Sequence, residues 1–145
     1  MQANSVAQAA RSAFLAAREV LWQHRTDLDA AVKAFRWPQL TQFNWALDYF
    51  DAMAAGNDRP GLWIVNEGGA EEKRSFRQLS ERSAQVACFL RGLGVKRGDR
   101  ILVMLGNEVA LWECMLAAFK LGAVVVPTTA LLSTDALRDR IERGH

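Results

Sequence analysis

The 145-residue sequence has few of the side chains that bind metals or form disulfides. It contains two cysteines, Cys88 and Cys114, and two histidines, His24 and His145. The cysteines form no C-x-x-C pair and both fall in predicted helices, so we expect two buried, reduced thiols. One histidine lies late in a predicted surface helix and the other is the last residue. No metal cluster can be assembled from this set, and we predict no metal ligand.

The sequence also lacks a strong excess of either charge. Lysine and arginine total 18 against 16 aspartate and glutamate residues, which leaves a net charge of +2. The two signs are interspersed, without a basic or an acidic block. Proteins that bind nucleic acids or anionic membranes usually concentrate positive charge on one surface. We therefore predict no nucleic-acid partner.

Long apolar runs are missing too. None approaches the roughly 20 residues that a transmembrane helix needs, so we predict no membrane span. The N-terminal segment lacks the apolar centre of a secretory signal. Its arginines and serines on an Ala-rich helix faintly resemble a mitochondrial transit peptide, but Glu19, Asp27 and Asp29 follow and the helical pattern continues. We expect a cytoplasmic protein that retains these N-terminal helices.

What is present predicts an α/β fold that begins with helices. Hydrophobic residues make up 50% of the chain, and a domain of this length buries roughly 68–70% of its unfolded surface. Residues 5–36 repeat apolar side chains at helical spacing, with Thr26 as the predicted cap of a second helix. Pro38 ends this region. Residues 37–61 form a connecting segment with an aromatic group, for which we favour core packing over ligand stacking.

A β-hairpin is predicted next. Residues 62–66 are rich in β-forming side chains, Gly68-Gly69 supplies a turn, and residues 72–76 can return as the second strand. Ser75 and Gln78 fit a capping box, which predicts a helix immediately after the hairpin. Gly92 or Gly94 is expected to end that helix in a left-handed conformation.

The rest of the chain predicts a strand–helix–strand unit. Residues 101–105 and 123–126 are continuous apolar runs, typical of parallel strands covered on both faces, and Pro127 should stop the second. The helix between them should start at Asn107 and bury Trp112, Met115, Leu116 and Phe119. This order indicates a right-handed βαβ crossover. Ser133 or Thr134 should cap a last helix.

These segments together resemble the N-terminal part of the AMP-forming acyl-CoA synthetases of the medium-chain type, which belong to the adenylate-forming superfamily. Residues 43–51 look like the entry segment of that family, and residues 62–69 are similar to its first hairpin. Residues 75–79 and 120–127 match its first two core motifs. The matches cover about two-thirds of the chain, and their order makes the resemblance fairly specific.

The resemblance implies a single incomplete domain of residues 1–145. It would comprise N-terminal helices in 5–36, an aromatic connecting segment in 37–61 and, in 62–145, the α/β start of an AMP-binding domain. The family converts a carboxylic acid, ATP and CoA into acyl-CoA, AMP and pyrophosphate with Mg²⁺, and the resemblance places the chain in fatty acid metabolism. We expect none of these cofactors to be bound by the fragment, and its partner to be itself or the missing remainder of a synthetase.

The family's catalytic motifs are missing from this sequence. Its phosphate loop is rich in Ser, Thr and Gly and ends in Pro-Lys, so that backbone N–H groups cradle the phosphates. Thr128-Thr129 lacks those glycines and the lysine. We therefore assign no catalytic, cofactor-binding or metal residue, and only a substrate-side loop at Thr128 and Thr129. A polar residue that mammalian members contribute to this loop corresponds to Ala130.

Three hypotheses stay open at this point. The first is a fragment of an acyl-CoA synthetase that is inactive alone, produced by truncation, an early stop or a split reading frame. The second is a non-catalytic interaction module derived from that family, which pairs with a full-length synthetase. The third, an unrelated small α/β binding domain, has no ligand motif to support it.

Overall fold

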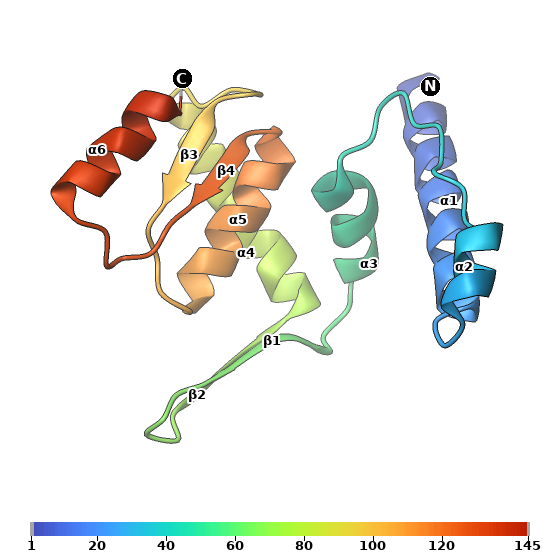
Figure 1. Ribbon diagram of the computed structural model, residues 1–145, viewed down its shortest axis with the longest axis horizontal. Helices are drawn as coiled ribbons and strands as arrows, with labels where there is room; N and C mark the ends of the chain where they lie inside the picture. Colours follow the sequence, from blue (N-terminus) through green and yellow to red (C-terminus); the bar gives the residue numbers. More distant parts are fainter. Residues whose placement is uncertain (1, 145) are drawn as a thin grey trace. The chain divides into compact units, whose positions relative to one another are not determined.

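The computed structural model describes residues 2–144 as two compact units, one up to Asn44 and the other from Trp45 onward. The first unit is helical, and the second mixes helices with two small sheets (Figure 1). The prediction of an α/β chain with N-terminal helices, a hairpin and a parallel βαβ unit is confirmed.

The first unit is a pair of helices, α1 (Gln2–Gln23) and α2 (Leu28–Ala34), which contact each other. The helical pattern predicted for this region is therefore present. Thr26 is not the cap of α2, because the Asp27 carboxylate accepts the hydrogen bond from the Ala30 N–H at 3.0 Å. The rings of Phe14 and Phe43 stack with their centroids 5.0 Å apart, which fixes the end of this unit against α1.

The second unit begins with the aromatic segment. Trp45–Asp51 forms a π-helical turn, η1, and Ala52–Ala54 continues it as α3. Phe50 is 6% exposed, and its ring centroid lies 6.2 Å from that of Phe76. Core packing is thus confirmed for Phe50, whereas Trp45 at 40% exposure lies at the surface.

The hairpin is formed by β1 (Pro60–Val65) and β2 (Glu71–Ser75), which pair antiparallel. Its turn lies at Gly69, which has a φ of +81° and donates its N–H to the Asn66 carbonyl at 2.8 Å. The predicted capping box is present where β2 passes into α4 (Phe76–Gly92), as the Ser75 hydroxyl accepts from the Gln78 N–H. Gly94 has a φ of +94° and supplies the expected left-handed residue after α4.

One glycine of the hairpin leaves room for a neighbouring ring. A Cβ on Gly61 would lie 2.9 Å from Cδ1 of Phe76 and 3.1 Å from the Phe76 backbone nitrogen. Because part of that obstacle is backbone, we expect Gly61→Ala to lower the free energy of unfolding by about 1–3 kcal/mol. Denaturant titration against Gly68→Ala checks this, since a Cβ on Gly68 meets nothing within 4 Å. Equal stabilities of the two variants would contradict it.

The βαβ unit consists of β3 (Arg100–Val103), α5 (Val109–Leu121) and β4 (Val124–Pro127). The two strands are parallel, with Arg100 opposite Val124. Gly122 ends α5 with a φ of +67°, in the left-handed region that glycine adopts at little cost. Two predicted strand boundaries are wrong. The first strand was expected to reach residue 105, but β3 ends at Val103. Pro127 was expected to stop the second strand before it, but it is the last residue of β4 and lies opposite Val103.

The start and the buried face of α5 also differ from the prediction. Glu108 occupies the cap position of α5, while the Asn107 side chain accepts a hydrogen bond from the Trp112 indole at 3.4 Å. Trp112 and Phe119 are exposed at 41% and 37%. The buried side chains of α5 are Val109, Glu113, Leu116, Ala117 and Ala118. Because α5 is apolar around most of its circumference, periodicity alone could not select the buried side.

The core of the second unit lies where α3, α4 and α5 meet. It is formed by Phe50, Ala54, Leu79 and Leu116, with Met53, Leu62 and Phe76 packed around it. Leu79 is 4% and Leu116 9% exposed. Helix α4 buries Leu79, Ser83 and Ala87. Cys88 lies on its exposed side, so the prediction of a buried thiol at this position is wrong.

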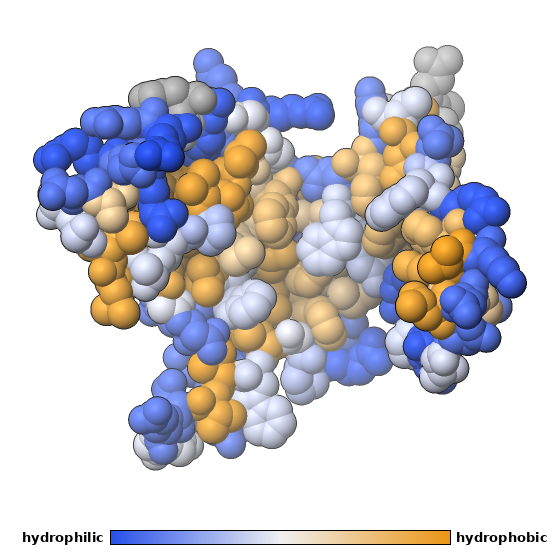
Figure 2. All heavy atoms as spheres, viewed as in Figure 1, coloured by the Kyte–Doolittle hydropathy of each residue, from blue (hydrophilic) through white to orange (hydrophobic). Residues whose placement is uncertain are grey.

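Helix α6 (Thr134–Arg143) follows β4 and has no fully buried residue. It begins at the predicted cap Ser133, whose hydroxyl accepts from the Ala136 N–H. Hydrophobic side chains reach the surface near this helix (Figure 2), and exposed ones include Leu131 in the loop before it and Ile141 within it. Val124, the first residue of β4, is exposed as well. Within residues 2–144 there is no helix long and apolar enough to cross a membrane.

Candidate functional site

The loop between β4 and α6 carries the two residues assigned to the substrate side, Thr128 and Thr129. The Thr128 N–H donates to the Val103 carbonyl at 2.9 Å, which extends the pairing of β3 and β4 by one residue. The Thr129 hydroxyl accepts from the Leu131 N–H at 3.2 Å. Both threonines therefore follow the carboxyl end of a parallel strand, the edge at which ligands bind in open α/β sheets.

The Thr128 hydroxyl is a buried oxygen without a hydrogen-bond partner among the described residues. A buried unsatisfied hydroxyl costs roughly 1–3 kcal/mol, so such groups usually have a partner in the complete structure. Thr129 is exposed, as are Ala130 and Leu131, which form the turn that follows it. The structure brings these loop residues together with the end of β3.

Lys120 is held in an ion pair that sequence reasoning did not find. Its Nζ lies 2.9 Å from Oδ1 of Asp51 and donates to the Ser80 carbonyl at 2.9 Å. The Ser80 hydroxyl donates to the same Asp51 oxygen at 2.7 Å. The Lys120 side chain is only 5% exposed. This lysine therefore joins η1, α4 and α5, and it is not available to a phosphate. The available signal was a lysine in the last turn of a largely apolar helix.

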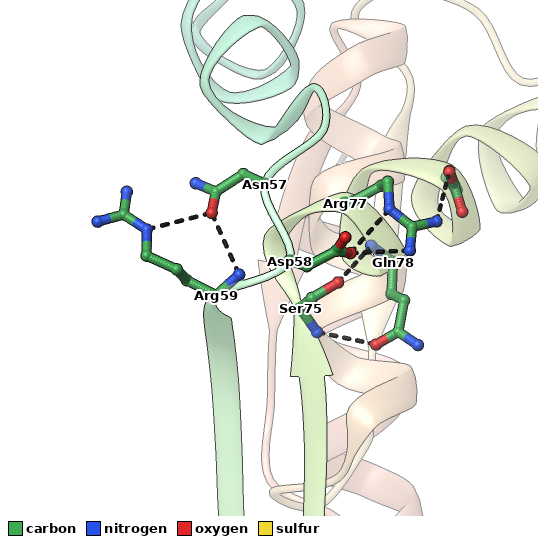
Figure 3. A network of polar contacts seen from close by, with 7 residues as sticks. Asn57, Asp58, Arg59, Ser75, Arg77 and Gln78 are labelled. Atoms are coloured by element: carbon green, nitrogen blue, oxygen red, sulfur yellow. Dashed lines mark hydrogen bonds and ion pairs between the residues drawn. The ribbon is translucent and has the colours of Figure 1, made fainter.

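A second polar network holds the base of the hairpin to α4 (Figure 3). Arg77 donates to the Asp58 carboxylate at 2.8 Å and to Glu81 at 3.3 Å. The hydrogen bond to Asp58, followed by that to Glu81, raises the pKa of the Arg77 guanidinium. The Arg77 side chain is 42% exposed. This arrangement fixes the loop before β1 and engages both carboxylates, Asp58 and Glu81, with Arg77.

Glu113 is a buried carboxylate in a polar groove between α4 and α5. It is 8% exposed, and Nε of Arg82 lies 3.6 Å from its Oε1. The groove has a volume of about 550 Å³. Burial, and then the nearby Glu113 charge, raise the pKa of the Cys114 thiol. Cys114 is half-buried and not fully buried as predicted.

No group of three His, Cys, Asp or Glu side chains in residues 2–144 could hold a metal ion. Lys120 is buried in its ion pair, and Nζ of Lys73 lies 3.9 Å from the centroid of the Trp63 ring. What the β4–α6 loop can do is donate and accept hydrogen bonds through Thr128 and Thr129.

Curated proteins similar to this chain are acyl-coenzyme A synthetases. The mitochondrial acyl-coenzyme A synthetase ACSM2 of Rattus norvegicus is 42% identical over 104 residues, which cover 66% of this chain and 18% of that protein. The mitochondrial ACSM2B of Homo sapiens is 40% identical over the same share of each chain. The acetoacetyl-CoA synthetase of Rattus norvegicus is 35% identical over 88 residues, which cover 60% of this chain and 13% of that protein.

Solved structures give the same picture of the fold. The crystal structure of CmiS6 is similar with a TM-score of 0.59 and 28% sequence identity. The match covers 70% of this chain and 25% of the CmiS6 chain. The Klebsiella oxytoca NpsA N-terminal subdomain in complex with 3-hydroxyanthranilyl-AMSN matches 66% of this chain with a TM-score of 0.58 and 26% identity. The chain spans 23% of that subdomain.

The family model described as AMP-binding enzyme matches residues 51–144. These residues include η1's last position, the hairpin, the βαβ unit and α6, so they cover nearly all of the second compact unit. The chain spans 18% of the length of the rat and human synthetases to which it is similar. On this match the chain belongs to the AMP-binding enzyme family, the adenylate-forming enzymes that include the acyl-CoA synthetases.

Proposed function

We propose that this chain is part of an ATP-dependent acid–CoA ligase, which converts a carboxylic acid, ATP and CoA into acyl-CoA, AMP and pyrophosphate. The observation that carries the proposal is the 42% identity to the rat acyl-coenzyme A synthetase together with the AMP-binding match over residues 51–144. The chain would supply the first α/β layer of the AMP-binding domain. Its acid substrate would be selected by residues outside this segment.

The isolated chain is proposed to be inactive. Its sequence has no Gly-rich phosphate loop with a lysine, and a loop of that kind is what brings backbone N–H groups close to phosphates. ATP, Mg²⁺ and CoA would be bound by the assembled enzyme. Thr128 and Thr129 would face its substrate side, and the unpaired Thr128 hydroxyl supports this placement because it still requires a partner.

A non-catalytic module is the second candidate function. The compact core formed by Phe50, Leu79 and Leu116 favours it, because a segment with a core of its own can fold and bind as a unit. Such a module would pair with a full-length synthetase or with a second copy. The first unit, up to Asn44, lies outside the residues 51–144 that the family model matches.

The test of these proposals is acid-dependent ATP–pyrophosphate exchange. We expect the pure 145-residue chain to show no exchange and no measurable affinity for ATP, since it lacks the phosphate loop. Co-expression with rat ACSM2 that lacks its matching segment should restore exchange if the chain is part of a ligase. Robust exchange by the homogeneous chain alone would overturn the proposal. Stable binding to the intact rat synthetase, without gain of activity, would favour the module.

The location is proposed to be cytoplasmic, with α1 retained. Helix α1 runs from Gln2 to Gln23 and contains Glu19, and α2 packs against it, as expected of a structural element. The rat and human relatives carry "mitochondrial" in their names, so the alternative is a removed targeting peptide. Intact mass of the protein isolated from its native host distinguishes the two. A mature N-terminus near residue 25 would contradict retention of α1.

A further inference from the structure

Apolar side chains of the first unit form an exposed strip along one side of α2. Leu28 and Val32 are one helical turn apart, and Phe35 follows three residues later, so the three share a face of the helix. The Phe35 ring meets the Trp37 ring edge-on, with the centroids 5.1 Å apart. Leu28 is 77%, Val32 67% and Trp37 81% exposed. We refer to these four side chains as the α2 strip.

The α2 strip is not covered by the first unit itself. Helix α2, all of which the structure describes, has no buried residue. Figure 2 shows hydrophobic side chains at the surface of the α1–α2 pair, with hydrophilic ones beside them. Exposed apolar surface that is rimmed by polar side chains commonly marks an interaction site. The strip is therefore a candidate docking surface.

The charges of this unit are uneven in two ways. Residues 1–44 contain five Lys or Arg and three Asp or Glu, so the whole net charge of +2 belongs to the first unit. The charges are also sorted along α2, since Asp27 and Asp29 lie at its start whereas Lys33 and Arg36 lie at its end. The end of the strip that carries Trp37 is therefore the positive end.

The cations are held close to the aromatic rings. The Arg36 guanidinium donates to the carbonyls of Lys33 and Phe35, both at 2.7 Å, which keeps it at the end of α2. Across the turn that joins α1 to α2, Arg25 lies 5.0 Å from the centroid of the Trp22 ring, a second exposed indole. This unit thus combines exposed tryptophans with neighbouring positive charge.

We propose that the α2 strip docks on the surface of a bilayer that contains anionic lipids, with Trp37 at the level of the headgroups and Lys33 and Arg36 against the lipid phosphates. Tryptophan concentrates at membrane–water interfaces. Amphipathic helices lie in that plane, and each cation near an anionic surface adds attraction. The contact is peripheral, in keeping with the lack of a membrane-crossing helix in residues 2–144. This inference goes beyond the proposed function and does not depend on it.

A second copy of the chain fits the α2 strip less well. Stable protein–protein interfaces use about 20–30 residues on each side, far more than the four of the strip. A lipid surface adapts its shape to a narrow apolar strip, so it needs no complementary partner surface. The long stems of lysine and arginine can also lie along apolar surface while their charged ends reach the phosphates.

Vesicle flotation tests the proposal with the 145-residue chain, because protein that merely self-associates does not float. The probes are vesicles of phosphatidylcholine with about 30% phosphatidylglycerol, and vesicles of phosphatidylcholine alone. We expect binding at least about tenfold tighter to the anionic vesicles, and loss of most of it in about 0.5 M NaCl. No binding to the anionic vesicles, or equal binding to both kinds, would overturn the inference.

The role of the tryptophan is tested by a matched pair of variants. Trp37→Gln should weaken binding to the anionic vesicles by about tenfold or more. Trp63→Gln, in the hairpin of the second unit, removes an indole that is also exposed, at 56%, and should leave binding unchanged. A loss with Trp63→Gln in place of Trp37→Gln would refute the assigned surface.

The role of the cations is tested in the same way. Lys33→Gln combined with Arg36→Gln should weaken binding by about tenfold or more. Arg138→Gln combined with Arg143→Gln removes two exposed cations of α6 and should not change it. Equal effects of the two double variants would contradict docking through α2. Sedimentation without lipid supplies the last outcome, since Trp37→Gln that abolishes self-association but leaves flotation intact would show a second copy on the strip.

Discussion

Replacing Lys120 with methionine is expected to lower the free energy of unfolding by about 3 kcal/mol. The Lys120 side chain is 5% exposed, and its Nζ lies 2.9 Å from the Asp51 carboxylate. Methionine would fill most of the volume but would leave Asp51 without its cation. Breaking one partner of a buried pair costs about 3–5 kcal/mol, and the 27% exposure of the Asp51 side chain places this case at the lower end.

Lys73→Met is the matched control for this prediction. Lys73 also lies 2.9 Å from a carboxylate, that of Glu71, but its side chain is 50% exposed. Exposed pairs contribute about 0.2–1 kcal/mol, so the control should lose much less stability. Urea unfolding of both variants provides the measurement. A double variant, Asp51→Leu with Lys120→Met, should regain part of the loss, because it removes both charges. Equal losses in the two single variants would refute the assigned role of Lys120.

The isolated chain is expected to self-associate and to bind the dye ANS at micromolar concentration. Val124 is 49%, Leu131 92% and Ile141 55% exposed. A large apolar side chain left in water forgoes about 1.5–3 kcal/mol, and a small domain has only about 5–15 kcal/mol of stability in total. The free edges of β3 and β4 add unpaired backbone groups that template association.

Sedimentation velocity and ANS fluorescence measure this effect, and one loop offers a matched pair of variants. Leu131→Gln should lower ANS fluorescence and weaken association, whereas Ala130→Gln, at the neighbouring exposed position, should change neither. A wild-type chain that is strictly monomeric, unfolds cooperatively and does not increase ANS fluorescence would contradict the prediction. Such a chain would close its own core, and the non-catalytic module would become the better proposal.

Local chemistry made several elements predictable from the sequence. The capping box at Ser75 and Gln78 acts between residues three apart, so it is readable without knowledge of the fold. The left-handed residue at Gly122 and the turn at Gly69 follow from a positive φ that glycine adopts at little cost. The order of the hairpin, α4 and the βαβ unit carried the family resemblance, which the AMP-binding match over residues 51–144 confirms.

The candidate site was predictable only as a loop. The sequence located Thr128 and Thr129 after an apolar strand, and the structure puts them at the carboxyl end of β4. The burial of the Thr128 hydroxyl depends on how β3 and β4 align, which no local pattern specifies. The assignment of this loop to the substrate side stays a prediction.

Tertiary packing decided what lies inside. Helix α5 has apolar side chains on most sides, so the contact with α4 selects Leu116 and Ala117 for burial and leaves Trp112 exposed. Cys88 is exposed because it lies on the side of α4 away from the buried Ser83 and Ala87.

The sequence by itself determined the elements, their order and their turns, because caps, glycines and apolar periodicity act between residues close along the chain. The ion pair of Lys120 with Asp51 joins residues far apart in the sequence, and only the packing of η1, α4 and α5 brings them within 2.9 Å. The burial of a charge depends on which surfaces meet, and that is a property of the folded chain as a whole.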